Sequence, residues 1–164
     1  MLPRRSRPAI ASSVEDGVQD RPYEGAFVDG THRFALRVYF EDTDAAGIVY
    51  YANYLRFMER ARSDMLRVVG IDQRDALARG LGVYAVAEVS IRYRAPARLD
   101  DALLILSEVR EVRAASCLIH QRVMRGERLL ADALVTAAFL TPEGRPQRQP
   151  RAWVESFERL KKEG

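Results

Sequence analysis

Three acidic side chains, Glu41, Asp42 and Asp44, occupy four consecutive positions early in the chain, just before Gly47 and a helical pattern. A helix start offers unpaired backbone N–H groups and a partial positive charge. Those donors can stabilise an oxyanion that forms on a carbonyl, while a nearby carboxylate acts as nucleophile or general base. The arrangement therefore indicates acyl-transfer chemistry, unless the acids only cap and solvate an ordinary turn.

The leaving group limits the kind of acyl bond that this arrangement can cleave. An oxoester or an amide usually needs an acid to protonate its leaving group, whereas a thiolate leaves readily. One carboxylate beside one helix start is sufficient for cleaving a thioester, and for little else in acyl transfer. If the acids are functional, we expect a thioester as the substrate bond.

The other reactive residues form no second motif. His32, His120 and the single cysteine, Cys117, lack metal-ligand spacing, so no metal is expected. Phosphate-loop, dinucleotide and serine-hydrolase motifs are absent from the sequence, and no cofactor is predicted. Cys117 opens an apolar strand pattern, which predicts a buried and unreactive thiol. The arginines are spread among acids without interleaved aromatic residues, so nucleic-acid binding is not expected.

Composition indicates an ordinary globular chain. Its 164 residues, 48% hydrophobic and 30% charged with a net charge of +3, allow one domain with a substantial core. A single cysteine cannot form a disulfide within the chain, which indicates a reducing compartment and predicts a cytoplasmic protein. The apolar runs are too short to span a bilayer, so stable membrane insertion is not expected.

The expected elements are one strand, one long helix and then four strands. Residues 1–30 lack apolar periodicity and are expected to be a flexible extension of a domain over 31–164. A strand is predicted over 33–40, and a helix over 51–69 that ends at Gly70. Later strand patterns cover 83–95, 102–112, 116–125 and 128–141, with short helices over 72–80 and 152–164. This order predicts an α+β domain whose antiparallel sheet wraps around one long central helix.

The segment VYFEDTDAAGIVYYANYLRFMERAR, residues 38–62, strongly resembles the hot-dog-fold acyl-CoA thioesterases. The matching groups are the Tol-Pal-associated acyl-CoA thioesterases and the 4-hydroxybenzoyl-CoA thioesterases, and YRAPARLDD at 93–101 is similar to them as well. The likeness extends from about Arg33 to residue 160. It implies the hot-dog fold, an acyl-CoA substrate, dimers joined at sheet edges that often pair into tetramers, and an active site at a subunit boundary.

The resemblance also implies roles for single residues. Asp44 matches the catalytic carboxylate, and Tyr51 matches the position whose backbone N–H polarises the thioester carbonyl. Tol-Pal-associated members commonly carry His there, so Tyr51 removes a possible catalytic imidazole and leaves the acyl preference open. Gly47 is the expected bend of the loop. Tyr50 and Asn53 complete the expected substrate-binding loop, with Asn53 orienting the loop or capping the helix.

Residues away from this loop have supporting roles in the same interpretation. Arg113 and Ser116 lie in a strand link that corresponds to coenzyme A phosphate contacts in related enzymes, although a solvated turn explains Arg113 equally well. Asp42 is expected to fix the loop or the helix end. Glu59 is expected to pair with an arginine three or four positions away.

Two other functions are open at this point. One is a non-catalytic protein that binds acyl-CoA or acyl carrier protein as a partner of envelope or lipid-synthesis machinery. The other is a hot-dog dehydratase, which would need a histidine beside the carboxylate. Whether Asp44 acts as nucleophile or as general base is open as well.

Overall fold

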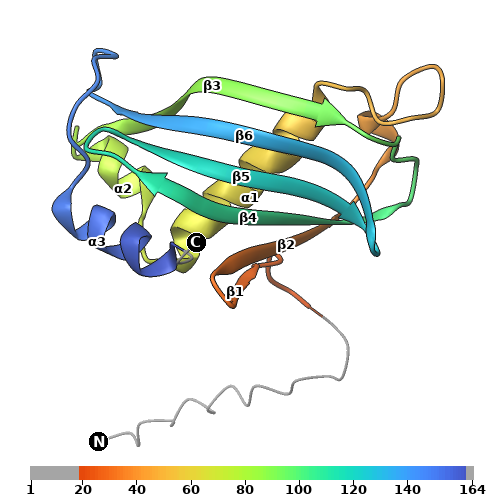
Figure 1. Cartoon of the computed structure of the whole chain (residues 1–164), viewed down its shortest axis with the longest axis horizontal. Helices are drawn as coiled ribbons and strands as arrows, with labels where there is room; N and C mark the ends of the chain where they lie inside the picture. The colour runs from red at the N-terminus through yellow and green to blue at the C-terminus, as the bar shows by residue number, and fades with distance from the viewer. Residues whose placement is uncertain (1–18, 162–164) are drawn as a thin grey trace, which may run out of the picture.

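One antiparallel sheet dominates the computed structural model, which describes residues 19–161. Its strands follow the order β1-β2-β4-β5-β6-β3. They are β1 (Ala26–Val28), β2 (Thr31–Arg37), β3 (Val83–Tyr93), β4 (Ala102–Val112), β5 (Ser116–Arg125) and β6 (Arg128–Leu140). The helices are α1 (Asn53–Val68), α2 (Gln73–Ala78) and α3 (Arg151–Leu160), with a 3-10 turn, η1, over Phe40–Asp42. Figure 1 shows the curved sheet lying across the long helix α1, so the predicted α+β architecture is confirmed.

Helix α1 forms because its apolar side chains recur every three or four residues and cover one face. The buried apolar residues of that face are Tyr54, Phe57, Met58, Ala61, Met65 and Leu66. Burying a large side chain of this kind stabilises a fold by about 1.5–3 kcal/mol. The helix ends at Val68 and is closed by Gly70, which has a φ of +85°. The Gly70 N–H donates to the Arg67 carbonyl, and the Ile71 N–H donates to the Leu66 carbonyl.

The four later strands confirm the sequence prediction to within two residues, and both short helices are present. The first strand differs, because β2 ends at Arg37 and not at Phe40. The Asp42 carboxylate accepts a hydrogen bond from the Tyr39 N–H, and this contact folds the chain into η1. Phe40 is consequently 81% exposed instead of packing on the strand face.

The strand β1 lies inside the segment that was expected to be a flexible extension. It pairs with β2 across a tight turn in which Asp29 and Gly30 have positive φ values of 49° and 74°. Ordered structure therefore begins earlier than the expected domain boundary at residue 31. Residues 1–18 lie outside the described residues, so their predicted flexibility stays a prediction.

Strand β3 is an edge strand, with β6 as its sheet neighbour. It ends at Tyr93 beside the start of α1, where the rings of Tyr93 and Tyr54 are 5.4 Å apart. From that point α1 crosses the sheet obliquely toward β4 (Figure 1). Within residues 19–161, no helix is both long and apolar enough to cross a membrane.

Candidate active site

The acidic segment folds into a compact loop closed by an antiparallel bridge between Thr43 and Val49. The Asp44 N–H donates to the Ile48 carbonyl over 2.9 Å, and the Gly47 N–H donates to the Asp44 carbonyl over 3.0 Å. Gly47 has a φ of +77°, which favours glycine at this bend. The loop therefore presents the Asp44 side chain from a fixed backbone.

One of the two oxygens of the Asp44 carboxylate is hydrogen-bonded within its own loop. Its Oδ1 atom accepts hydrogen bonds from the N–H of Ala46 at 2.9 Å and of Ile48 at 3.4 Å. None of the described residues donates a hydrogen bond to Oδ2, and the side chain is exposed. One oxygen thus fixes the orientation of the group while the other is available for chemistry.

Asp42 supports the loop, as expected. It is buried, and its Oδ2 atom accepts the Tyr39 N–H over 2.8 Å. Its carbonyl oxygen accepts hydrogen bonds from the Tyr50 N–H and from the Asn53 Nδ2 group, each over 2.9 Å. Asn53 therefore orients the loop. The alternative role as helix cap is wrong, because Ala52 occupies the cap position.

Tyr51 lies in the turn immediately before α1. Its carbonyl oxygen accepts a hydrogen bond from the Tyr93 hydroxyl over 2.9 Å, which ties the turn to the end of β3. None of the described residues accepts a hydrogen bond from the Tyr51 N–H. The ring of Tyr50 lies 4.9 Å from that of Tyr51, and a hydrogen bond to Tyr51 raises the pKa of Tyr50.

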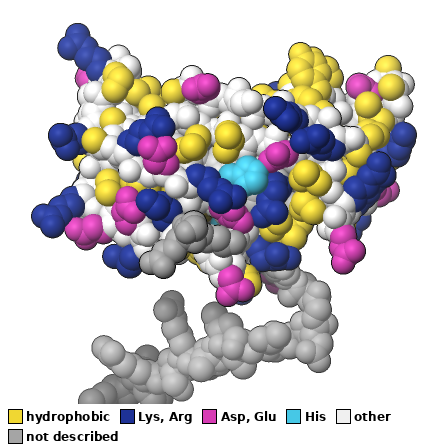
Figure 2. Space-filling model, in the orientation of Figure 1, with side chains coloured by type: hydrophobic (Ala, Val, Ile, Leu, Met, Phe, Trp, Pro, Cys, Tyr) yellow, Lys and Arg dark blue, Asp and Glu magenta, His cyan; other side chains and the backbone are white. Residues whose placement is uncertain are grey.

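A hollow of about 340 Å³ adjoins this turn. It is lined by Ile48, Val49, Tyr51, Tyr54, Tyr93, Arg94, Ala95 and Pro96. Figure 2 shows hydrophobic side chains on the end of the molecule that carries the acidic loop. The exposed aromatic residues of this region are Tyr39, Phe40, Tyr50, Tyr51 and Tyr93. A surface of this kind is typical of a ligand or protein contact.

The segment that follows β3 connects the acidic loop to α1 through hydrogen bonds of Ala97. The Val49 N–H donates to the Ala97 carbonyl, and the Ala97 N–H donates to the Tyr54 hydroxyl, each over 2.9 Å. The segment YRAPARLDD resembles the family, but the sequence did not predict that its first residue, Tyr93, fixes the Tyr51 turn. The signal that could have identified Tyr93 is its position at the start of this segment.

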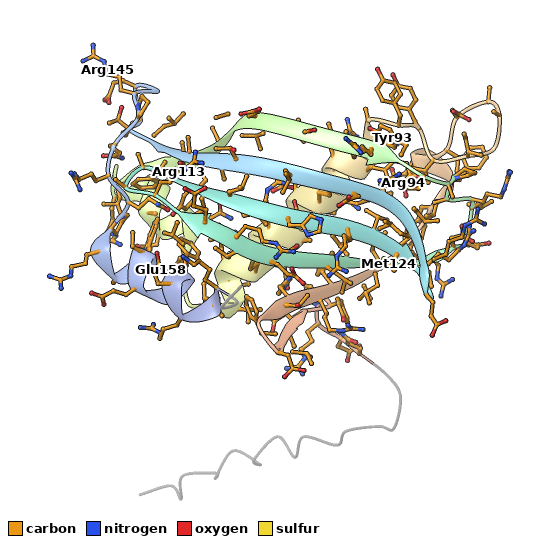
Figure 3. All side chains as sticks on the ribbon, in the orientation of Figure 1. Tyr93, Arg94, Arg113, Met124, Arg145 and Glu158 are labelled. Atoms are coloured by element: carbon orange, nitrogen blue, oxygen red, sulfur yellow. The ribbon has the colours of Figure 1, made fainter. Side chains whose placement is uncertain are left out.

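Arg113 and Ser116 lie far from the acidic loop within one chain. Ser116 is level with Ala85 in the sheet, since both pair with Ala138. Ala85 precedes Tyr93 by eight strand residues, which corresponds to about 26 Å. Figure 3 shows Arg113 and Tyr93 toward opposite ends of the sheet.

The Arg113 guanidinium is exposed and already engaged. Its Nε and Nη2 atoms lie 3.0 and 2.8 Å from the two carboxylate oxygens of Glu111. A phosphate contact by this arginine would therefore compete with a surface ion pair, which is a weak interaction in solvent. The assignment of Arg113 and Ser116 to coenzyme A binding stays a prediction.

Neither histidine joins the acidic loop. His32 is buried against Asp64 near the far end of α1, with Nε2 2.8 Å from Oδ2. His120 lies on the sheet face opposite α1, where it contacts Asp132. The histidine that a dehydratase would need beside Asp44 is therefore not found among the described residues.

The structure shows the surroundings of Cys117 and of the potential metal ligands. Cys117 is buried, and burial raises the pKa of its thiol to about 11, which confirms the expected unreactive cysteine. Among residues 19–161, no cluster of three or more potential metal ligands is present.

Comparison with known proteins agrees with this geometry. Residues 38–157 match the thioesterase-like superfamily. The acyl-CoA thioesterase YbgC of Haemophilus influenzae is 38% identical over 135 residues, which cover 82% of this chain and 99% of that protein. A probable thioesterase from Bartonella henselae has a crystal structure that is 36% identical with a TM-score of 0.70, covering 73% of this chain and 99% of that one.

A 1,4-dihydroxy-2-naphthoyl-CoA thioesterase from Synechocystis has the same fold. Its TM-score is 0.72 at 25% identity, with 77% of this chain and 95% of that chain covered. The matched region includes the acidic loop, α1 and all four later strands. The chain therefore belongs to the thioesterase-like superfamily and has its hot-dog fold.

Proposed function

We propose that this protein is an acyl-CoA thioesterase, which hydrolyses an acyl-CoA thioester to the free acid and coenzyme A. The observation that carries the proposal is the presence, at the start of α1, of the Asp44 Oδ2 atom and the Tyr51 N–H, neither of which has a hydrogen-bond partner among the described residues. Membership of the superfamily and the names of its relatives support the same activity.

The thioester carbonyl lies at the turn before α1, where its oxygen accepts a hydrogen bond from the Tyr51 N–H. This donor stabilises the negative charge that develops on the oxygen during attack. Tyr93 holds this donor in place, because its hydroxyl donates a hydrogen bond to the carbonyl oxygen of Tyr51. The side chain at position 51 is therefore not required for the polarisation, which explains why a tyrosine serves here.

Two routes use these groups. In the first, Asp44 attacks the carbonyl carbon, the C–S bond breaks and the thiolate leaves with its electron pair. Water then hydrolyses the acyl-aspartyl anhydride to the acid and free Asp44. In the second, Asp44 takes a proton from water while the water oxygen attacks the carbonyl carbon, and the same bond breaks. That proton then passes to the departing thiolate or to solvent.

The assembly we propose is a dimer joined at the β3 edges, which can pair again into a tetramer. Val86 and Val89 of this edge strand are 49% and 38% exposed. An exposed strand edge pairs readily with a second copy. A two-fold axis through the middle of β3 would place the Tyr93 end of one protomer beside the Tyr84 end of its partner. The single cysteine fits a cytoplasmic location.

The test is free-thiol release from short, long and aromatic acyl-CoAs by the wild type and by Asp44→Asn. The exposed Asp20 provides a matched control, Asp20→Asn, which removes a carboxylate outside the site. We expect Asp44→Asn to lose at least about 100-fold in kcat and the control to keep its rate. Equal rates for Asp44→Asn and wild type, with all proteins in the same folded oligomer, would contradict the proposal.

Oxygen-18 water and trapping of the anhydride together separate the two routes. In a single turnover, label in the Asp44 side chain marks an anhydride that water opens at the Asp44 carboxyl carbon. Water that opens the anhydride at the acyl carbon labels the acid and leaves Asp44 unlabelled, as the general-base route does, and trapping of an acyl-Asp44 anhydride distinguishes these two cases.

A further inference from the structure

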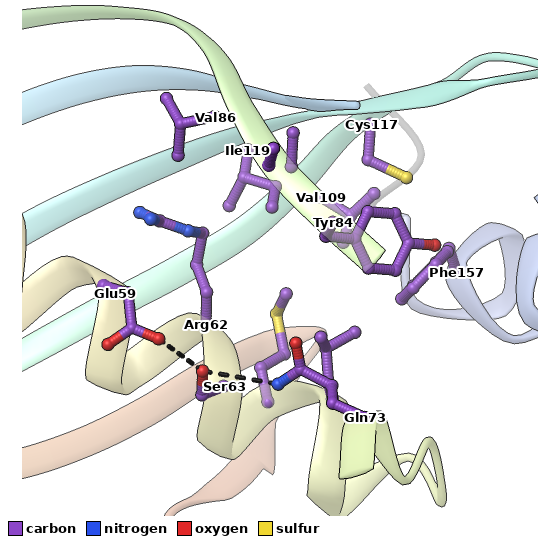
Figure 4. A pocket seen from close by; sticks show the side chains of 14 residues that line it. Glu59, Arg62, Ser63, Gln73, Tyr84, Val86, Val109, Cys117, Ile119 and Phe157 are labelled. Atoms are coloured by element: carbon purple, nitrogen blue, oxygen red, sulfur yellow. Dashed lines mark hydrogen bonds between the residues drawn. The ribbon is translucent and has the colours of Figure 1, made fainter. Parts of the chain in front are cut away.

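A second cavity, of about 250 Å³, lies between α1, β3 and α3 (Figure 4). Its apolar lining includes Met65, Leu66, Val109, Ile119, Ala137 and Phe157. It forms where α1 diverges from β3 as the helix crosses the sheet. A dry cavity of about 150 Å³ holds a benzene molecule, so this one can take a somewhat larger apolar group.

The rim of the cavity on α1 is polar. The Gln73 Nε2 group donates to the Ser63 hydroxyl over 3.4 Å, and that hydroxyl donates to Glu59 Oε1 over 2.6 Å. Among the described residues, Glu59 forms no ion pair with an arginine, so the expected pairing is wrong. Its carboxylate accepts the Ser63 hydroxyl instead, and it acts on the neighbouring cavity arginine only through its charge.

That arginine is Arg62, whose stem rises from α1 toward Val86 and Ile119 (Figure 4). Its Nη1 group donates one hydrogen bond, to Gln121 Oε1 over 2.8 Å. Gln121 is fully buried and held by its own bonds to Met58 and Ser107. Within the described part of the chain, no carboxylate lies within 4 Å of the Arg62 guanidinium.

The remaining N–H groups of Arg62 are accessible to a ligand, because none of them is buried without a hydrogen-bond partner. Burial lowers the pKa of Arg62, and the charge of Glu59 offsets part of that effect. A guanidinium so placed, with one neutral partner at the wall of an apolar cavity, is suited to an anionic oxygen pair.

We infer that this cavity binds the acyl group and that Arg62 selects acyl groups ending in a carboxylate over plain hydrocarbon chains. The inference rests on the proposed thioesterase function and deepens it. Within one chain, Arg62 lies nine residues beyond the helix start, about 14 Å along α1, so the cavity is separated from the acidic loop of the same chain. In a dimer joined at β3, the cavity of one protomer faces the hollow lined by Tyr51 and Tyr93 in its partner. An acyl chain can then extend from Asp44 of one chain into the cavity of the other.

Adipoyl-CoA and hexanoyl-CoA test this selection, because both acyl groups have six carbons and differ in the terminal carboxylate. We expect the wild type to favour adipoyl-CoA in kcat/KM by about 10-fold or more, the effect of one hydrogen bond to a charged group. Arg62→Met should remove this preference and still hydrolyse hexanoyl-CoA. Arg62→Lys keeps the charge and should keep part of it. The exposed Arg60 on the same helix gives the control Arg60→Met, which should leave the ratio unchanged.

Calorimetric binding of the same two thioesters to Asp44→Asn and to the double variant Asp44→Asn with Arg62→Met adds a readout that needs no turnover. A preference for adipoyl-CoA that disappears with Arg62 supports the inference even if the wild type releases no thiol, and in that case only the proposed function fails. Equal binding of both thioesters, or a wild-type preference that survives Arg62→Met, would overturn the selection by Arg62.

Discussion

The imidazole of His32 and the carboxylate of Asp64 form a fully buried pair that joins β2 to α1, with Nε2 2.8 Å from Oδ2. The same carboxylate oxygen accepts the Gly25 N–H over 2.9 Å. A Cβ atom at Gly25 would lie 2.3 Å from the Arg33 carbonyl oxygen, so this close approach requires glycine. The pair therefore fixes the segment before β1 against the central helix.

The stability of the protein should depend on this pair as pH falls. Burial lowers the pKa of His32 below 6.5, although the hydrogen bond to Asp64 opposes the shift. Below about pH 6.5 the unfolded chain binds a proton that folded His32 does not, so the free energy of unfolding decreases, by at most about 1.4 kcal/mol per pH unit.

Urea unfolding of the wild type, His32→Gln and the control His120→Gln between pH 8 and pH 5 measures this effect. His32→Gln should be less stable at pH 8 and should show a shallower decrease toward pH 5. An identical slope in His32→Gln and wild type would show that another group titrates.

Tyr93→Phe should lower turnover without unfolding the protein. The change removes the hydroxyl that holds the Tyr51 carbonyl and leaves the ring in the hollow, so the oxyanion donor loses its orientation. We expect kcat to fall about 3- to 10-fold and the unfolding free energy to change by about 1 kcal/mol or less. Tyr51→Phe is the control, because it retains the backbone N–H and should retain most of the activity.

Gly47→Ala should affect catalysis through the backbone alone. A Cβ at Gly47 meets nothing within 4 Å, so the cost comes from the φ of +77°, about 1 kcal/mol. Gly144 has a φ of +87° with the same open surroundings, in the loop after β6. Both alanine variants should lose similar stability, but only Gly47→Ala should lose activity. A fully active Gly47→Ala protein would show that the bend is not needed for placing Asp44.

Mixed dimers test whether the proposed site is shared between protomers. Ser63 lies at the cavity rim, and Ser63→Trp should obstruct the cavity of its own chain. Each homodimer, Asp44→Asn or Ser63→Trp, should be weakly active. A co-expressed hybrid combines Asp44 of one chain with the open cavity of the other, so one of its two sites is intact. Recovery of about half the wild-type activity is expected, and none is expected if each chain uses its own cavity.

Much of this fold could be read from periodicity and turn residues. The α1 stripe and the four later strands depend on local patterns, and these predictions succeeded to within two residues. The end of β2 could not be read in this way. Its pattern continues to Phe40, but the side chain of Asp42 captures the Tyr39 N–H and breaks the strand.

The candidate site was predictable in part for the same reason. The order of Asp44, Gly47 and the helix start is local, and the structure brings these residues together. The contact of Tyr93 with Tyr51 joins residues 42 positions apart, and only the completed sheet creates it. The cavity beside Arg62 depends on the oblique path of α1, which no local pattern specifies.

The strand order has a consequence for synthesis of the chain on the ribosome. Strand β3 emerges early but finds its sheet neighbour, β6, only after residues 128–140 have been made. Strand β2 similarly waits for β4. Until then α1 has no finished sheet to cover its apolar face. Nascent chains that stop before β6 should therefore be prone to aggregation and depend on chaperones, and the domain should acquire its native structure late, as one cooperative unit.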